Sequence, residues 1–353
     1  MSLKHLGLIG AATMLASATF AQDYLPILQY HHVSASTPRS TSLSPEEFKE
    51  HMDYLAEANF NVVDLAKALD DIRNGVALPD KAVAITFDDA YRNIYQNGFP
   101  ILKEHGFPFT VFINTQPIEQ KNRSFLTWDQ IKEMTQSGGV FANHTVSHPY
   151  MARMEEGESH GQWKARMEKE VADVEAALEE HLGTSPKMLA YPYGESNQEI
   201  RTLLTDQGIV GFGQQSGVVS KDSNFADLPR FPAAGNYAKL STLKTKLNSM
   251  PMPLEKVEAG GDFAGEMPVS LTLSFKDGQY RLKDLACYVS GQGKAALNWL
   301  DDTTVVAAAE KPFGVGRGRI NCTMPNRAGS QYYWFSNVWI RAGEDQRYVS
   351  QKN

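Results

Sequence analysis

Residues 82–90, with the sequence AVAITFDDA, decide the fold class of this chain. The run 82–87 is apolar without alternation, which is typical of a strand buried on both faces of a sheet. Asp88 and Asp89 end the run. Active sites of α/β sheets and barrels lie at the carboxyl ends of the strands, so both carboxylates are candidates for chemistry. The alternative is that one of them only caps the helix that follows.

Strand-like and helical segments alternate on both sides of this run. Ser44, Pro45 and Glu47 predict a capping box with proline at the first helical position. Strands are expected at 25–30, 62–63, 82–87, 109–113, 140–142, 188–190 and 210–212, and helices at 45–58, 91–105, 127–134 and 162–181. The alternation predicts an α/β domain over residues 22–249, a distorted (β/α) barrel of about seven strands.

The last part of the chain has a different pattern. Residues 250–268 are rich in Pro, Gly and Glu, which is typical of a linker. Residues 269–353 hold strand-like runs between Gly and Asp turns, so we expect a small C-terminal all-β domain, similar to a β-sandwich. Its aromatic residues are either sandwich core or a platform that stacks on sugars, which makes carbohydrate binding a hypothesis for this domain. The aromatic residues in question are Tyr332, Tyr333, Trp334, Phe335 and Trp339.

Residues 1–21 have the pattern of a signal peptide. Lys4 and His5 precede an apolar run, and small residues surround a cleavage position after Ala21. The alternative is a membrane anchor, but the run is shorter than the roughly 20 apolar residues that span a bilayer. We therefore expect export to the periplasm or the medium, with no membrane span after cleavage.

The composition is that of a globular protein, with 353 residues of which 42% are hydrophobic and 21% charged. The net charge of -7 and the lack of a basic stripe argue against a nucleic-acid partner. Cys287 and Cys322 are the two cysteines. In an oxidising compartment we expect them to form one disulfide, the alternative being two buried free thiols.

Two further motifs follow later strands. His144 and His148 lie in HTVSH, and two imidazoles together with a carboxylate have the composition of a catalytic divalent-metal site. Residues 191–194, YPYG, come directly after another expected strand. Their proline and glycine fix the direction of a backbone N–H, which suits an oxyanion hole, although the motif could also be a simple turn.

Together these motifs resemble the polysaccharide deacetylases, the NodB-homology group also called carbohydrate esterase family 4. The resemblance rests on TFDDA (86–90), HTVSH (144–148) and AYPYG (190–194), and it covers about residues 25–235. Residues 43–63 and 126–134 are similar to the exported branch that includes poly-β-1,6-N-acetylglucosamine deacetylases. The resemblance implies a divalent metal, for which we expect zinc, held by Asp89, His144 and His148, with Asp88 as the general base.

The chain departs from the family pattern at two places. An arginine usually stands three residues before the motif tyrosine and orients the base, but Ala190 stands there; Arg230 is our substitute. The late Leu-x-His motif, the usual source of the general acid, is also missing. In the exported branch a histidine on the first strand has that role, and QYHHV (29–33) matches it, so His31 is the expected acid and His32 the alternative.

The function that the resemblance implies is removal of N-acetyl groups from an N-acetylglucosamine-containing polysaccharide, with release of acetate. In this mechanism Asp88 accepts a proton from the attacking water, the N–H of Tyr193 stabilises the oxyanion, and His31 protonates the departing amine. One alternative is an esterase that removes O-acetyl groups from xylan or a similar polymer. Another is a sugar-binding protein without catalysis.

Overall fold

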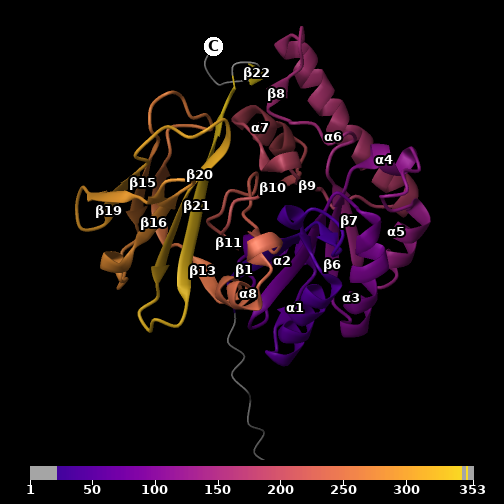
Figure 1. Cartoon of the computed structure of the whole chain (residues 1–353), viewed down its shortest axis with the longest axis horizontal. Coiled ribbons are helices and arrows are strands. Elements are labelled where there is room, and N and C mark those ends of the chain that lie inside the picture. The colour runs from indigo at the N-terminus through magenta and orange to yellow at the C-terminus, as the bar shows by residue number, and fades with distance from the viewer. Residues whose placement is uncertain (1–21, 344–346, 349–353) are drawn as a thin grey trace, which may run out of the picture.

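The computed structural model describes residues 22–343 and 347–348. The expected signal peptide, residues 1–21, lies outside the described residues. None of the described helices combines the length and the apolar character that crossing a membrane requires. Figure 1 shows two units side by side, a helix-rich α/β unit and a second unit formed by the later strands.

The α/β unit is built on one sheet with the strand order β10-β9-β7-β6-β5-β1-β11. The strands from β10 to β1 run parallel, and β11 pairs antiparallel with β1. In the described residues this path stays open between β10 and β11, which confirms a distorted barrel of about seven strands. The strands are β1 (Tyr24–Tyr30), β5 (Ala82–Asp88), β6 (Phe109–Ile113), β7 (Gly139–Asn143), β9 (Met188–Ala190), β10 (Val210–Phe212) and β11 (Val218–Ser220).

Short strands complete this unit. β4 (Asn61–Val62) pairs with β5, and β12 (Phe231–Pro232) pairs with β1. Two small ladders stand apart from the main sheet: β2 (His32–Val33) with β3 (Ser42–Leu43), and β8 (Arg153–Met154) with β22 (Arg347–Tyr348).

The helices connect the strands and cover the sheet, as seen in Figure 1. They are α1 (Pro45–Glu57), α2 (Leu65–Arg73), α3 (Phe99–His105), α4 (Thr115–Glu119), α5 (Trp128–Thr135), α6 (His160–Leu182), α7 (Gln198–Asp206) and α8 (Leu240–Leu247). The capping box predicted at Ser44 is present, and Thr127 forms another. The helix expected over 91–105 contains a π-helical turn, Ile94–Gly98, before α3. Pro100 explains the irregularity, because it has no N–H for the regular ladder.

β5 is buried on both faces, as its uninterrupted apolar sequence predicts. Ile85 and Phe87 belong to one core cluster and Ala84 to the other, since successive side chains point to opposite faces. Asp88 is the last residue of the strand, and Asp89 then has a left-handed backbone with φ of 73°. The two carboxylates therefore leave the strand end in different directions.

The second unit contains two β-sheets. One has the order β13-β21-β20-β16-β17 and the other β14-β15-β19-β18. Their strands are β13 (Ser249–Pro251), β14 (Leu254–Glu258), β15 (Ser270–Phe275), β16 (Ala286–Val289), β17 (Gly293–Lys294), β18 (Ala296–Trp299), β19 (Thr304–Ala308), β20 (Gly316–Pro325) and β21 (Tyr332–Arg341). A single core cluster takes side chains from both sheets, so the expected C-terminal all-β domain is confirmed.

Two features of this unit differ from the sequence-based expectation. The segment 250–268, expected as a linker, contains most of β13 and all of β14, which pair with β21 and β15. The Pro and Gly content of the segment gave no sign of either partner, of which β21 lies far away in the sequence and β15 is the next strand in the chain. The ten-residue strand β20 was not expected either, since its first four residues, GRGR, have no apolar side chain.

The two cysteines and the aromatic residues have separate places in this unit. Cys287 and Cys322 are opposite each other on β16 and β20 and form the predicted disulfide. Trp339 is buried in the core. Trp334 instead packs against Phe231 of the α/β unit, with ring centroids 5.2 Å apart.

Candidate active site

Asp89, His144 and His148 lie together at the carboxyl ends of β5 and β7. Each histidine places its Nε2 atom 3.2 Å from Oδ1 of Asp89, and the three potential ligand atoms all lie within 4.8 Å of one another. Hydrogen bonds and charges from the imidazoles hold the pKa of Asp89 well below its ordinary value, although burial opposes this. Two nitrogens and one oxygen at this spacing fit a divalent cation with positions left for water.

The ring of His144 has a fixed orientation. Its Nδ1 atom lies 2.7 Å from the carbonyl oxygen of Ala190, the last residue of β9. Donation from Nδ1 to this carbonyl leaves Nε2 free to face Asp89, which is the arrangement that metal-binding histidines commonly have. Ala190 therefore contributes through its backbone at the position where the family pattern has an arginine.

Helix α6 holds the loop that carries His148. The Glu170 carboxylate accepts hydrogen bonds from the backbone N–H groups of Val146 and Ser147, at 2.8 and 2.9 Å, and from the Ser147 hydroxyl at 2.7 Å. A further bond, 3.1 Å long, runs from the His148 N–H to the Thr145 hydroxyl. The sequence did not indicate a role for Glu170. It is one of several acidic residues in a charged helix, and nothing in its sequence neighbourhood shows that it binds the HTVSH loop.

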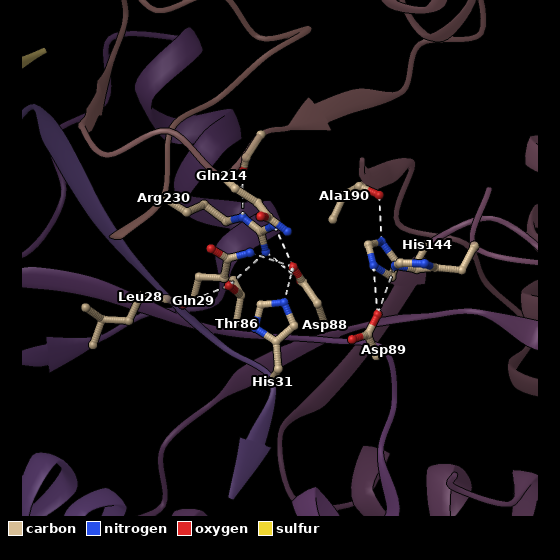
Figure 2. A network of polar contacts seen from close by, with 12 residues as sticks. Leu28, Gln29, His31, Thr86, Asp88, Asp89, His144, Ala190, Gln214 and Arg230 are labelled. Atoms are coloured by element: carbon tan, nitrogen blue, oxygen red, sulfur yellow. Dashed lines mark hydrogen bonds and ion pairs between the residues drawn. The ribbon is translucent and has the colours of Figure 1, made fainter. Parts of the chain in front are cut away.

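Asp88 points away from this group and is completely buried. Figure 2 shows its carboxylate among Arg230, Gln29 and His31, while Asp89 faces His144. Arg230 donates from Nη1 to Oδ1 at 2.7 Å and from Nη2 to Oδ2 at 2.8 Å, and the Gln29 amide donates to Oδ2 at 2.7 Å. Burial would raise the pKa of Asp88, but the charges of Arg230 and the neighbouring histidines outweigh it and lower the pKa to about 2.

The Arg230 side chain is itself held on several sides. Its Nε donates to the Gly213 carbonyl at 3.0 Å, and its Nη1 donates to the Thr86 hydroxyl at 3.3 Å. Thr86 in turn donates to the Leu28 carbonyl at 2.7 Å. Gln29 and Thr86 were not singled out from the sequence. The available signal was polarity, since both are polar residues inside otherwise apolar strands.

His31 lies beside Asp88, and His32 does not. The His31 Nε2 atom is 3.8 Å from Oδ2 of Asp88, and burial lowers the pKa of this imidazole more than the nearby aspartates raise it. His32 stacks on Tyr91 with ring centroids 3.6 Å apart, and its Nδ1 atom is 2.9 Å from the Asn93 amide nitrogen. Of the two histidines, His31 is thus the one next to the buried carboxylate.

The YPYG motif forms a 3-10 turn, Pro192–Gly194, next to His148. The rings of Tyr193 and His148 have centroids 4.5 Å apart, and Tyr193 also stacks on Tyr150 at 3.8 Å. Tyr193 has a left-handed backbone with φ of 57°. The turn therefore brings its backbone and ring to the edge of the Asp89, His144 and His148 group.

Backbone strain is concentrated in the three motifs. Of the nine non-glycine residues with positive φ in the described chain, five lie in TFDDA, HTVSH and AYPYG. Such conformations cost about 1–3 kcal/mol each and persist where the surroundings enforce them, often at functional sites. The five residues with positive φ in the three motifs are Asp89, Ala90, Thr145, His148 and Tyr193.

Comparison with known proteins assigns the three motifs to one domain. Residues 75–212, which contain all three motifs, match the family model for polysaccharide deacetylases. Residues 75–212 therefore carry a polysaccharide deacetylase domain, which confirms the resemblance seen in the motifs.

Individual relatives cover the α/β unit. YxkH of Bacillus subtilis is 29% identical over 58% of this chain and 70% of its own length. The poly-β-1,6-N-acetyl-D-glucosamine N-deacetylase of Staphylococcus aureus is 27% identical over 60% of this chain and 73% of its length. The Escherichia coli enzyme of the same name is 24% identical over 64% of this chain, but this covers only 38% of that protein.

Solved structures share the fold. IcaB from Ammonifex degensii matches with a TM-score of 0.56 and 27% identity, over 64% of this chain and 98% of that chain. The Streptococcus pyogenes deacetylase PplD, determined with acetate, matches with a TM-score of 0.58 and 23% identity over the same shares of the two chains.

Proposed function

We propose that this protein is a metal-dependent hydrolase that removes N-acetyl groups from an N-acetylglucosamine-containing polysaccharide and releases acetate. The observation that carries the proposal is the division between two adjacent carboxylates. Asp89 faces two imidazoles, whereas Asp88 faces Arg230 and His31. A hydrolase that needs one carboxylate for an ion and another for proton transfer requires this separation, because a carboxylate bound to the ion is a poorer base.

Asp89, His144 and His148 would hold the ion, for which we propose zinc. When bound, a divalent ion polarises an acetyl carbonyl and lowers the pKa of water, so that hydrolysis proceeds near neutral pH. The donor set of two nitrogens and one oxygen, and the fixed orientation of His144, support this assignment.

Asp88 and His31 would move the proton. Asp88 accepts it as water attacks the acetyl carbon, and the sugar amine must receive a proton as the C–N bond breaks. His31, 3.8 Å from Asp88, can take up this proton because its lowered pKa leaves it neutral in the resting enzyme at neutral pH. It then delivers the proton to the departing amine. The number of protons balances, since water supplies the one that the amine receives.

Tyr193 and Arg230 complete the proposed machinery. The turn at Pro192–Gly194 lies beside the histidines, and the N–H of Tyr193 would stabilise the oxyanion. Arg230 would keep Asp88 ionised and oriented. The names of the Staphylococcus aureus and Escherichia coli relatives support an N-acetylglucosamine polymer as substrate.

We further propose export to the periplasm or the medium after cleavage near residue 21, a catalytic domain over residues 22–249, and a C-terminal β domain after it in which β14 is the first complete strand.

The test is acetate release from defined substrates by the metal-loaded protein. Oligomers of β-1,6-linked N-acetylglucosamine, chitin oligomers and acetylxylan should be compared at equal acetyl concentration. The proposal expects acetate and free amines from at least one N-acetylated oligomer. Acetate from acetylxylan alone would identify an esterase, and no acetate from any substrate together with polymer binding would contradict catalysis.

A further inference from the structure

Two arginines of the C-terminal β unit reach across to the α/β unit, and one of them lies beside the YPYG turn. Arg317 and Arg319 are two residues apart on β20, so their side chains leave the same face of that strand. Arg317 donates from Nη2 to the Gln214 side-chain oxygen at 3.0 Å. Arg319 donates from Nη2 to the Tyr237 hydroxyl at 3.2 Å. Both partners belong to the α/β unit.

Arg317 lies directly against the YPYG turn. A Cβ at Gly194 would clash with Nη1 of Arg317 and would lie 2.8 Å from Cβ of Gln214, so this guanidinium packs closely against the glycine. Gly194 follows Tyr193, whose ring is 4.5 Å from that of His148. The guanidinium therefore lies beside the turn that carries Tyr193, whose ring contacts His148.

The positive charges of Arg317 and Arg319 are not paired with a carboxylate in the described part of the chain. Within residues 22–343, neither Arg317 nor Arg319 has a carboxylate within salt-bridge distance, and the partners described above are neutral. Glu195, which attracts Arg317, already pairs with Arg153 at 2.8 Å. Lys246 adds a third cation, which lies 4.6 Å from the Tyr237 ring.

These cations repel one another. Loss of solvent around the guanidinium and the charge of Arg319 lower the pKa of Arg317, although the residue keeps an exposed surface, and burial with the charge of Arg319 lowers the pKa of Lys246 to about 7. Like charges that are brought together without an acid destabilise the folded protein, and an anion bound between them would remove that cost. If these positions only had to join the two units, uncharged side chains could form the same two hydrogen bonds without this repulsion.

We propose that Arg317 and Arg319 form a subsite for an anionic group, a carboxylate or a phosphate, on a sugar next to the one that is deacetylated. Guanidinium groups match both anions with paired hydrogen bonds. The proposal rests on the proposed function and adds that the preferred substrate is an acidic N-acetylated polysaccharide. The positive charge of the two arginines would repel a neighbouring sugar that already carries a free, protonated amine.

The experiment compares two soluble substrates with the full-length, metal-loaded protein. One is a neutral N-acetylglucosamine oligomer, and the other is an oligomer in which N-acetylglucosamine alternates with glucuronate. We measure kcat/KM for acetate release and express the result as the acidic-to-neutral ratio. Arg317→Gln should lower this ratio about tenfold or more, mainly through KM, since a hydrogen bond to a charged group is lost. Arg319→Gln should lower it in the same direction.

The matched control is Arg327→Gln. Arg327 also donates to a glutamine oxygen, that of Gln279, but it lies beyond the end of β20 and belongs with its partner to the same unit. This variant should leave the ratio unchanged. Thermal unfolding of all three variants shows whether each one is folded before its kinetics are compared.

Three outcomes would overturn the subsite. Equal losses on both substrates would mean that the arginines only join the two units, and no loss on either would mean that they do not contact the polymer. Inorganic phosphate that binds alone as tightly as the acidic oligomer would point to a free anion as the ligand. If the wild-type protein releases no acetate from any substrate, the proposed function fails instead, and binding of the two oligomers by calorimetry still tests the arginines.

Discussion

Arg230 and Asp88 form a buried, two-point ion pair although 142 residues separate them in the chain. Both side chains are completely buried, so the pair is shielded from water. A buried pair of this kind contributes little net stability, but losing one partner leaves an uncompensated charge in the interior. The pair therefore holds Asp88 as a carboxylate in one orientation, and its disruption should be visible in stability as well as in activity.

The first prediction is a double-mutant cycle on this pair. Arg230→Met and Asp88→Asn should each destabilise the protein, by about 3–5 kcal/mol for the arginine change, because a buried charge loses its partner. The double variant should recover part of this loss. Urea unfolding at pH 7 measures the four proteins. Single losses that simply add in the double variant would show that the two groups are not coupled.

The same pair predicts a pH dependence. The pKa of Asp88 is lowered in the folded state to about 2, so its contribution is present above the unfolded-state pKa and is lost as the pH falls towards about 2. The difference in unfolding free energy between the wild-type protein and the double variant should change between about pH 4 and pH 2 and stay constant above that range. A change centred near neutral pH would assign the effect to another group.

The second prediction concerns metal binding. Asp89→Asn should weaken zinc binding by more than the roughly 10–100-fold typical of residues behind the ligands, because a ligand charge is removed. Asp88→Asn should change zinc affinity much less while it lowers acetate release. Calorimetry and metal analysis after dialysis give both values. Equal loss of zinc in the two variants would mean that Asp88 is also a ligand.

The third prediction separates the two neighbouring histidines. His31→Ala should lower turnover on an N-acetylated oligomer by about 10²-fold or more, the usual effect of a lost acid–base group. An aryl acetate, whose leaving group needs little protonation, should be affected much less. His32→Ala is the matched control, since His32 stacks on Tyr91. A larger loss for His32→Ala than for His31→Ala would reverse the assignment.

The fourth prediction tests how α6 supports His148. Glu170→Gln removes the charge that accepts three hydrogen bonds from residues 146 and 147, so zinc affinity should fall by about tenfold. Glu168→Gln is the control, because Glu168 lies on the same helix, is 47% exposed and only approaches Lys164 at 3.9 Å. Zinc titration by calorimetry distinguishes them, and a similar loss in both variants would indicate a general effect of helix charge.

The fifth prediction concerns the disulfide. Cys287 and Cys322 are 35 residues apart, and closing a loop of this length restricts the unfolded chain by an amount worth about 3–4 kcal/mol. Replacement of both by alanine should lower the unfolding free energy of the β unit by about this amount. Tryptophan fluorescence would be ambiguous, because Trp128 and Trp163 lie in the α/β unit and the other three tryptophans lie in the β unit. Hydrogen exchange on β16 and β20 during denaturant unfolding is therefore the better measurement. Unchanged exchange on these strands would contradict the prediction.

Local patterns predicted α1, α3, α5 and α6 and most strands of the main sheet, but not α2, α4, α7 or α8. The capping box of Ser44 and Glu47 predicted the start of α1, and the apolar run 82–87 predicted β5. Both signals lie within a few residues of the element that they predict. The patterns failed where pairing decided the structure. β14 and β20 form because β15 and β21 offer hydrogen bonds and the two sheets share a core, which the charged residues of β14 and the Gly and Arg residues of β20 do not reveal.

The sequence by itself determined which chemical groups stand at the end of the sheet. Asp88, Asp89, His144 and His148 each follow a short apolar run, and parallel strands bring their carboxyl ends to one edge. Only the tertiary structure decided which partners surround each group. The contacts of Arg230 with Asp88, of Glu170 with the HTVSH loop and of Arg317 with Gly194 join segments far apart in the chain. Such contacts depend on how helices and sheets pack, and no local pattern of residues encodes that packing.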